Sequence, residues 1–170
     1  MRKKWLRAPY GFSLIELLVV LFIISILSSL IALNIGILST THAPAELNLL
    51  HACMVTCQQK AIASGKQQSM HFLVAENGYR SDNQTHYFAK KVRFGIVETV
   101  KGPPSHPITL LNAPVTFSNN TVIFYPDGII TAGTVYLVDH RKKLYALSSG
   151  VGNVSFLRKY RYDDAWKLMD

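Results

Sequence analysis

The chain begins with a long apolar run. From Leu17 to Leu38 no side chain carries a charge, and the appreciably polar residues in this run are Ser25, Ser28, Ser29 and Asn34. The run holds 22 residues, and a helix of about 20 apolar residues is long enough to cross a bilayer. The pattern therefore predicts a helix suited to a membrane.

A second helical pattern follows a short polar break. Residues 39–44 are polar and end in Pro44, and helical spacing of apolar residues then resumes through Ser64. Its apolar positions are Leu47, Leu50, Met54, Cys57, Ala61 and Ile62. They predict an amphipathic helix that stops at Gly65. Pro44 either begins this helix or kinks a continuous rod, because proline is tolerated in a first turn but removes a hydrogen bond inside a helix. A rod from residue 12 to residue 64 would be about 80 Å long.

Beyond Gly65 the pattern changes to short β-branched and aromatic runs separated by turn residues, which is typical of antiparallel sheets. We expect strands at 68–75, 79–81, 92–97, 115–118, 121–125, 134–138, 143–148 and near 153–157. Asn77-Gly78 joins the first pair as a hairpin, and 134–138 pairs with 143–148 across residues 139–142. The loop at 101–107 is too rich in proline for regular structure.

The formal charge of +8 divides into two parts. Arg2, Lys3, Lys4 and Arg7 precede the apolar run without an acid, which is a topology signal that keeps the N-terminus cytoplasmic. Beyond the membrane segment 14 Lys and Arg face 9 Asp and Glu, so the rest of the chain is basic at about +5. A positive net charge favours binding to anionic surfaces, but it does not identify which surface.

One acid, Glu16, interrupts the start of the apolar stretch. A carboxylate within a membrane helix costs about 2.5 to 3.5 kcal/mol on insertion scales, so it needs water or a partner. One interpretation is a signal anchor whose Glu16 is hydrated among cytoplasmic headgroups. The other is that cutting between Gly11 and Phe12 frees an α-amine, which lies one helical turn from Glu16 and reaches the Glu16 of a neighbouring subunit.

The run Gly11-Phe12-Ser13-Leu14-Ile15-Glu16-Leu17-Leu18-Val19-Val20 closely resembles the class III signal of type IV pilins and type II secretion pseudopilins. In that family a membrane aspartyl prepilin peptidase cuts after the glycine and methylates the new first residue. The resemblance implies cleavage between Gly11 and Phe12, N-methylation of Phe12, and an assembly role for the carboxylate of Glu16.

The remainder resembles the GspH/FimT-type pseudopilins and minor pilins. The resemblance rests on four runs, Lys60 to Gly65, Val122 to Gly128, Gly133 to Leu137 and Leu144 to Ser148. Residues 82–114 match nothing in this group. Some FimT-like minor pilins bind DNA through a Gly-Arg-x-Arg element near the C-terminus, but the matching place here reads Gly152-Asn153-Val154-Ser155. Arg158, Lys159 and Arg161, a few residues downstream, are the candidates for nucleic-acid contact; solvated surface charge or contacts to acidic neighbour subunits explain them as well.

Other chemistry finds little support in the residues. Cys53 and Cys57 share a helix face, a geometry that suits a mutual disulfide poorly, and the main interpretation is two small buried apolar residues. Oxidative pairing and a metal site with His51 are the alternatives, and the metal site lacks a fourth ligand. The six histidines show no metal-ligand spacing, and Ser149-Gly150 is not a nucleophile elbow, so we expect no enzyme, no metal and no cofactor.

The residues together predict an α+β protein, in which a long hydrophobic N-terminal helix packs on a small antiparallel β-sheet head. The expected parts are a leader at 1–11, an assembly helix at 12–38, its amphipathic continuation at 39–65 and the β-rich head at 66–170. The resemblance implies a minor pilin or pseudopilin of a secretion pseudopilus or type IV pilus. Its partners would be prepilin peptidase, the inner membrane, which it spans once with its head in the periplasm or outside, and other pilins in a filament. The alternative is a DNA-binding minor pilin of a DNA-uptake pilus.

Overall fold

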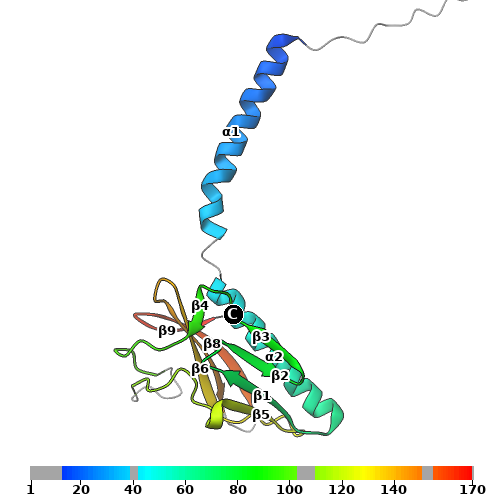
Figure 1. Cartoon of the computed structure of the whole chain (residues 1–170), viewed down its shortest axis with the longest axis vertical. Coiled ribbons are helices and arrows are strands. Elements are labelled where there is room, and N and C mark those ends of the chain that lie inside the picture. The colour runs from blue at the N-terminus through cyan, green and yellow to red at the C-terminus, as the bar shows by residue number, and fades with distance from the viewer. Residues whose placement is uncertain (1–12, 39–41, 103–109, 151–154, 170) are drawn as a thin grey trace, which may run out of the picture. The chain divides into compact units, whose positions relative to one another are not determined.

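The computed structural model describes residues 13–38, 42–102, 110–150 and 155–169, with backbone alone for 27–38. It consists of two compact units, Met1–Thr40 and Thr41–Asp170. The first unit contains α1 (Leu14–Leu38) (Figure 1). The second unit, here called the head, contains α2 and two antiparallel sheets. The α+β class predicted from the sequence is confirmed, with two sheets in place of one.

The helix of the head, α2, runs from His42 to Ser64. Pro44 lies in its first turn, where the missing N–H breaks no bond. Six residues at alternating spacings of four and three form its buried stripe, namely Ala43, Leu47, Leu50, Met54, Cys57 and Ala61. The helix ends where Gly65 takes the left-handed conformation at φ 63° and its N–H bonds to the Ile62 carbonyl at 3.4 Å. The amphipathic helix is thus confirmed.

The first sheet has the order β3-β2-β1-β5. Its strands are β1 (Gln68–Leu73), β2 (Gly78–Ser81), β3 (Gln84–Tyr87) and β5 (Thr121–Phe124). The predicted hairpin at Asn77-Gly78 is confirmed, since β1 pairs with β2 and Asn77 has a φ of 58°. Asn77 also ties this sheet to the next, because its Nδ2 donates to the Val92 carbonyl at 2.7 Å and its Oδ1 accepts from the Phe94 amide at 2.9 Å.

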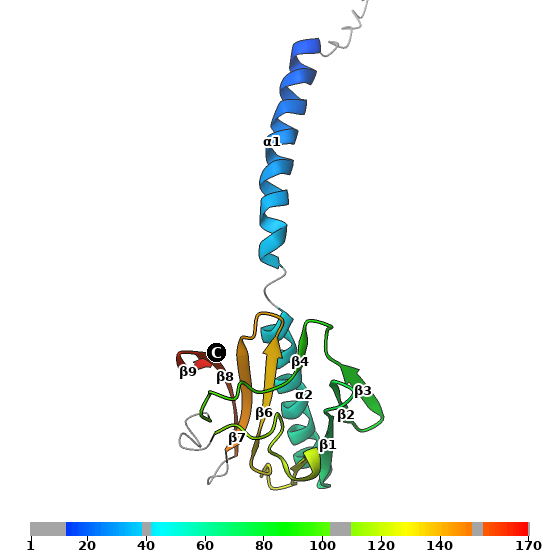
Figure 2. The ribbon, with the colours of Figure 1, turned by 60° about the vertical axis from the view of Figure 1, so that its left-hand side comes forward.

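The second sheet has the order β4-β6-β7-β8-β9. Its strands are β4 (Val92–Phe94), β6 (Gly133–Asp139), β7 (Leu144–Gly150), β8 (Phe156–Asp163) and β9 (Ala165–Met169). The predicted pairing across residues 139–142 is confirmed as β6 with β7. Figure 2 shows β4 and β6 beside α2, with β9 on the far side of the sheet from it.

Three strand predictions need correction. The expected strand at 115–118 is wrong: Val115 forms a single bridge to Val135, and residues Ser118–Asn120 form a 3-10 turn, η1. Residues Thr121–Phe124 form β5 and pair with β1, and this register places Val122 opposite Met70 in the core. The expected last strand near 153–157 is instead β8, which pairs with β9; residues 151–154 lie outside the described ranges. The strand expected at 92–97 ends at Phe94.

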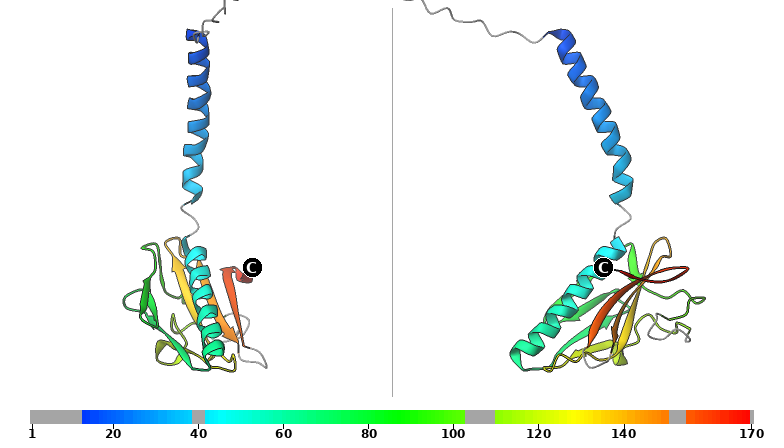
Figure 3. Two further views of the ribbon diagram at one scale, coloured as in Figure 1. Left: turned by 90° about the vertical axis from the view of Figure 1, so that its right-hand side faces the viewer. Right: turned by 180° about the vertical axis from the view of Figure 1, so that it is seen from behind.

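The main core lies where α2 meets both sheets, as Figure 3 shows from two sides. It joins the stripe of α2 to Met70 and Phe72 of the first sheet and to Val135 and Leu137 of the second. Full burial of one such side chain contributes about 1.5 to 3 kcal/mol. These contacts hold α2 against the two sheets.

A smaller core covers the face of the second sheet that points away from α2. Alternate residues of β6, Tyr136 and Val138, pack there with Val100 and Leu111 from the segment that follows β4. Trp166 of β9 closes it, and its Nε1 donates to the Lys101 carbonyl at 2.8 Å. Much of the stretch 82–114, which matched nothing by sequence, thus provides β3, β4 and a cover for this sheet.

Candidate functional site

The start of α1 carries the acid singled out by the sequence. Glu16 lies in the first turn, where its amide and that of Leu17 donate to the Ser13 carbonyl at 3.0 and 3.2 Å. A negative charge is favoured at a helix N-terminus by the helix dipole. Gly11 and Phe12, the predicted cleavage site, lie outside the described residues.

The side chains around Glu16 form an apolar surface. Every large apolar side chain from Leu14 to Ile26 is exposed, by 81% at the first and 45% at the last. Ser25 does not interrupt this surface strongly, because its hydroxyl donates to the Phe22 carbonyl at 2.8 Å within the helix. An apolar surface of this extent marks contact with lipid or protein.

By length and hydropathy, no helix in the part of the chain that the structure describes qualifies as a membrane span.

The three basic residues predicted to contact nucleic acid do not form one group. Successive side chains of a strand point to opposite faces of the sheet. Arg158 of β8 lies on the face away from α2, with its guanidinium 4.2 Å from the centre of the Phe156 ring. Lys159 faces α2, where its Nζ donates to Asn48 Oδ1 at 3.0 Å. Arg161 shares that face and lies 3.7 Å from a carboxylate of its own strand. The sheet therefore divides the predicted contact surface.

A different basic group forms at one end of the second sheet. It combines two segments about 50 residues apart in the sequence, and we call it the basic surface: Lys90, Lys91, Arg93, Arg141, Lys142 and Lys143. The register of β4 and β6, in which Val92 lies opposite Asp139, places the start of β4 beside the turn between β6 and β7. Figure 2 shows both at the same end of the sheet. All six side chains are exposed.

The turn between β6 and β7 holds half of the basic surface in place. Asp139 Oδ1 accepts hydrogen bonds from the amides of Arg141 and Lys143, each at 2.8 Å. Lys142 takes the left-handed conformation at φ 60°, which closes the turn. Among the described side chains, no carboxylate forms an ion pair with any of the six cations. Two segments far apart in the sequence thus place six exposed cations at one end of the sheet, and one of them, Lys143, contributes to lowering the pKa of Asp163.

The cysteines and histidines occupy separate places. Cys57 is buried and Cys53 half-buried, and both are free thiols. His86 Nε2 lies 3.0 Å from Oε2 of the Glu46 carboxylate. Oε1 of the same carboxylate accepts a hydrogen bond from the Ala89 amide at 3.0 Å. Within the described ranges, no group of three or more His, Cys, Asp or Glu side chains is arranged to hold a metal ion.

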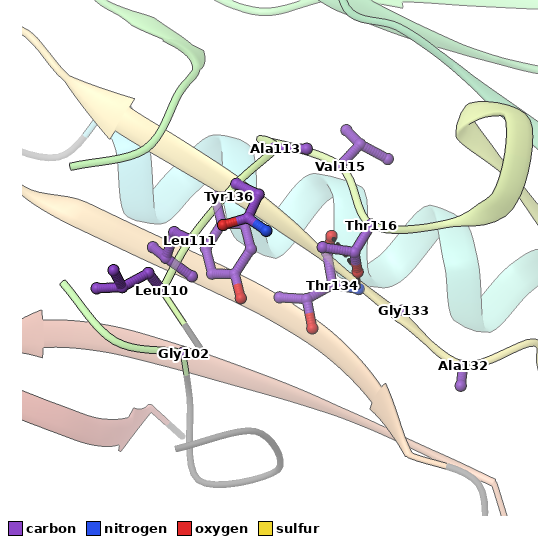
Figure 4. A pocket seen from close by; sticks show the side chains of 11 residues that line it. Gly102, Leu110, Leu111, Ala113, Val115, Thr116, Ala132, Gly133, Thr134 and Tyr136 are labelled. Carbon is purple, nitrogen blue, oxygen red and sulfur yellow. Dashed lines mark hydrogen bonds between the residues drawn. The ribbon is translucent and has the colours of Figure 1, made fainter. Parts of the chain in front are cut away.

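A cavity of about 520 Å³ lies between residues 110–116 and β6 (Figure 4). Its hydroxyls are already engaged: Thr116 Oγ1 accepts from the Thr134 amide at 2.7 Å, and Thr134 Oγ1 donates to Ser148 at 3.1 Å. Burial raises the pKa of the Tyr136 phenol at its wall to about 12. Among its described lining residues the cavity offers no charged group to a ligand.

Comparison with known proteins identifies the N-terminal segment. Residues 6–32 match the family model of the prokaryotic N-terminal methylation motif, a range that includes Gly11, Phe12 and Glu16. The chain therefore carries the type IV prepilin-like signature. This motif supports a type IV pilin-like protein that prepilin peptidase processes and that assembles with other pilins as a structural subunit. No curated protein and no solved structure showed a significant match.

Proposed function

We propose that this protein is a minor subunit of GspH/FimT type in a type II secretion pseudopilus or a type IV pilus. Prepilin peptidase cuts it between Gly11 and Phe12 and methylates Phe12. The processed chain crosses the inner membrane once, with its head outside the cytoplasm, and enters a filament through its N-terminal helix. The four head runs that resemble this group support the minor type.

One observation carries the proposal. Within the methylation motif, α1 presents an exposed apolar surface with a single carboxylate, Glu16, in its first turn. Leaving that carboxylate alone in hydrocarbon costs about 2.5 to 3.5 kcal/mol. The α-amine created at Phe12 supplies a cation at the same depth in the membrane as the Glu16 carboxylate. Pairing of this amine with the Glu16 carboxylate of a neighbouring subunit offsets the cost only in the assembled filament.

Replacing Glu16 tests this role. Glu16→Ala is expected to leave membrane insertion and cleavage intact while incorporation into sheared filaments falls at least about tenfold, since 1.4 kcal/mol corresponds to a factor of ten. Ser25→Ala is the matched control, because it removes a polar side chain from the same helix without a charge, and it should assemble normally. Unchanged incorporation of Glu16→Ala would exclude the assembly role of the carboxylate.

Processing has its own test. Mass spectrometry of the mature protein should find methylated Phe12 as the first residue. Replacing Gly11 by valine should leave the longer, unmethylated chain in the membrane fraction. A mature N-terminus at any other residue would refute the assigned cleavage site.

A second candidate function, capture of DNA by the head, is favoured by the basic surface. Six exposed cations from two segments lie at this end of the sheet, and among the described side chains no carboxylate lies within ion-pair distance of them, although Lys143 contributes to lowering the pKa of Asp163. Cations grouped in this way neutralise backbone phosphates and release counterions, an interaction that needs no base sequence. Because Arg158 and Lys159 lie on opposite faces of the sheet, we assign the candidate DNA contact to the basic surface and not to β8.

Electrophoretic mobility shift with residues 41–170 tests the second candidate. Each cation that no longer neutralises a phosphate should lower the slope of log affinity against log salt by about 0.7 to 0.9. Lys90→Gln with Lys91→Gln should therefore flatten the slope by more than one, while Arg158→Gln, on the opposite face from α2, should change it little. Absence of salt-sensitive binding by the unmodified head would exclude DNA capture and leave the assembly role untouched.

A further inference from the structure

A cleft opens beside the hairpin of β8 and β9, where the segment that follows β4 approaches it. Its volume is about 670 Å³, which lies within the range of about 300 to 1,000 Å³ that small-molecule sites occupy. Five of the side chains that line it bear on what it can bind, namely Thr99, Lys101, Tyr162, Asp164 and Trp166. Neither the methylation motif nor the basic surface includes any of them.

Two aromatic rings form one corner of this cleft. Tyr162 of β8 and Trp166 of β9 lie opposite each other in the strand register, with ring centres 5.3 Å apart and ring planes at 68°. Both rings are half-buried and pack against the smaller core, which holds them in place. The hydrogen bond from Trp166 Nε1 to the Lys101 carbonyl, at 2.8 Å, fixes the indole further. A ligand therefore meets a rigid aromatic surface, which keeps the entropy cost of binding low.

Two opposite charges border the aromatic corner. Asp164 occupies the turn between β8 and β9, and its φ of 60° is one that Asp adopts more readily than most residues. Its neighbour Asp163 already pairs with Lys167 at 3.0 Å, whereas Asp164 and Lys101 form no ion pair with any described side chain. Both groups are exposed. The cleft thus offers an acceptor carboxylate and a donor ammonium to a ligand.

The combination of charges and rings selects the class of ligand. Lys101 opposes a simple cation, and Asp164 opposes a simple anion, as do the negative faces of the two aromatic rings. A neutral sugar meets neither opposition. Its C–H groups carry partial positive charge that suits a ring face, and its hydroxyls both donate to a carboxylate and accept from an ammonium. In a glucose-type ring every hydroxyl is equatorial, so both faces present C–H groups.

We propose that this cleft binds a neutral glucose-type hexopyranose unit of a carbohydrate. The sugar ring stacks in the corner of Tyr162 and Trp166, its hydroxyls donate to Asp164, and Lys101 and Thr99 donate to its oxygens. Because the cleft is open to water and its polar groups are few, a short oligosaccharide binds weakly, with a dissociation constant of about 1 mM. The site adds a binding function to the head that does not depend on the assembly helix.

The test uses the purified full chain with Trp5→Phe, which leaves Trp166 as the only tryptophan. A polyoxyethylene detergent keeps it soluble, because such a detergent carries neither sugar nor ammonium. Titration with cellotriose or maltotriose should change the Trp166 fluorescence in a saturable way. Tetramethylammonium chloride and inorganic phosphate, the cation and anion probes, should not. No saturation by either sugar, or saturation by tetramethylammonium or phosphate instead, would overturn the proposal.

Two substitutions at Tyr162 separate stacking from packing. Tyr162→Phe keeps the ring and should bind within about twofold of the unmodified chain, since the hydroxyl is not part of the stack. Tyr162→Leu keeps an apolar side chain without a ring face and should weaken binding about threefold to tenfold. Circular dichroism confirms that both variants are folded. Equal binding by the Leu and Phe variants would contradict a stacked sugar.

Asp164→Asn gives an independent test at an exposed turn position, where Asn also adopts a positive φ readily. It should weaken binding about tenfold, because a hydrogen bond to a charged group contributes about twice as much as one to a neutral group. Asp127→Asn is the matched control, since it removes the same charge from an exposed turn that does not line the cleft. It should bind as the unmodified chain does. Equal effects of Asp164→Asn and Asp127→Asn would refute the role of Asp164.

Discussion

Phe72 joins the two sheets of the head, so its removal is the sharpest test of the fold. Phe72 is on β1 of the first sheet and is 1% exposed. Its ring lies 6.2 Å from that of Phe94 on β4, edge to face, and 5.6 Å from that of Phe117, stacked. One side chain thus contacts the second sheet and the segment that bridges to β6.

The expected cost of Phe72→Ala follows from these contacts. Replacing a buried Phe by Ala costs about 3 to 5 kcal/mol through lost transfer energy and a residual cavity. Each aromatic pair adds about 0.5 to 1.5 kcal/mol beyond the buried area, which points to the upper part of that range. For a head of about 130 residues, 1 kcal/mol corresponds to about 3 to 4 °C, so a loss of about 4 to 5 kcal/mol should lower the melting temperature by about 12 to 20 °C.

The assay is urea unfolding of residues 41–170, followed by near-ultraviolet circular dichroism, with thermal melting in parallel. Leu168→Ala, at a position that is 61% exposed on β9, is the control and should change stability by about 0.5 kcal/mol or less. The slope of the unfolding curve should not change, because the surface exposed on unfolding is the same. A loss below about 1 kcal/mol for Phe72→Ala would refute the role of this ring in joining the sheets.

Three further changes test other parts of the head. Gly78→Ala should destabilise it by about 1 to 3 kcal/mol, because the added Cβ meets the His86 carbonyl of the paired strand, which cannot move without breaking the β2–β3 ladder; denaturant titration measures this. Glu46→Ala should cost about 1 to 3 kcal/mol in the same titration, since it leaves the Ala89 amide without its acceptor, and Glu46→Gln should recover most of the loss. Burial raises the pKa of Tyr136 to about 12, so the unfolded chain ionises first and stability should fall as pH rises from about 10 to 12; Tyr136→Phe should fall less steeply.

Matched controls accompany these changes. Glu76→Ala removes an exposed carboxylate whose only described contact, at 3.5 Å, is the Tyr87 hydroxyl, and it should be nearly neutral. Equal losses from Glu46→Ala and Glu76→Ala would contradict the role of Glu46. A profile for Tyr136→Phe as steep as that of the unmodified head would contradict the assignment of the alkaline loss to Tyr136, and a neutral Gly78→Ala would contradict the close approach of β2 and β3.

The predictable parts of the fold are those with strong local patterns. The apolar stripe of α2 repeats over six buried residues, so the helix was predicted. Asn77-Gly78 and residues 139–142 form turns between strands, so both hairpins were predicted with the strands that they join. β3 reads Gln-Thr-His-Tyr, which has no apolar alternation and forms a strand because β2 offers it an edge. β9 follows Asp164, whose φ of 60° closes a tight hairpin that the surrounding sequence does not indicate.

The functional sites divide in the same way, into those encoded by consecutive residues and those that depend on strand pairing. The run around Gly11, Phe12 and Glu16 is local and highly specific, so it was found from the sequence and matches the methylation motif. The nucleic-acid contact at Arg158, Lys159 and Arg161 stays a prediction, and its three side chains do not share one face because side chains alternate along a strand. The strand register instead joined Lys90 to Arg93 with Arg141 to Lys143.

By itself the sequence determined that this chain carries a prokaryotic N-terminal methylation motif with one acid in an apolar stretch, because both are encoded in consecutive residues. Only the tertiary structure decided which residues of the head act together. Cys57 meets Ser81 across 24 residues, and Lys91 approaches the turn at Arg141 across 50. Such meetings depend on strand register and on the packing of α2, which arise from the burial of the whole core rather than from any local run of residues.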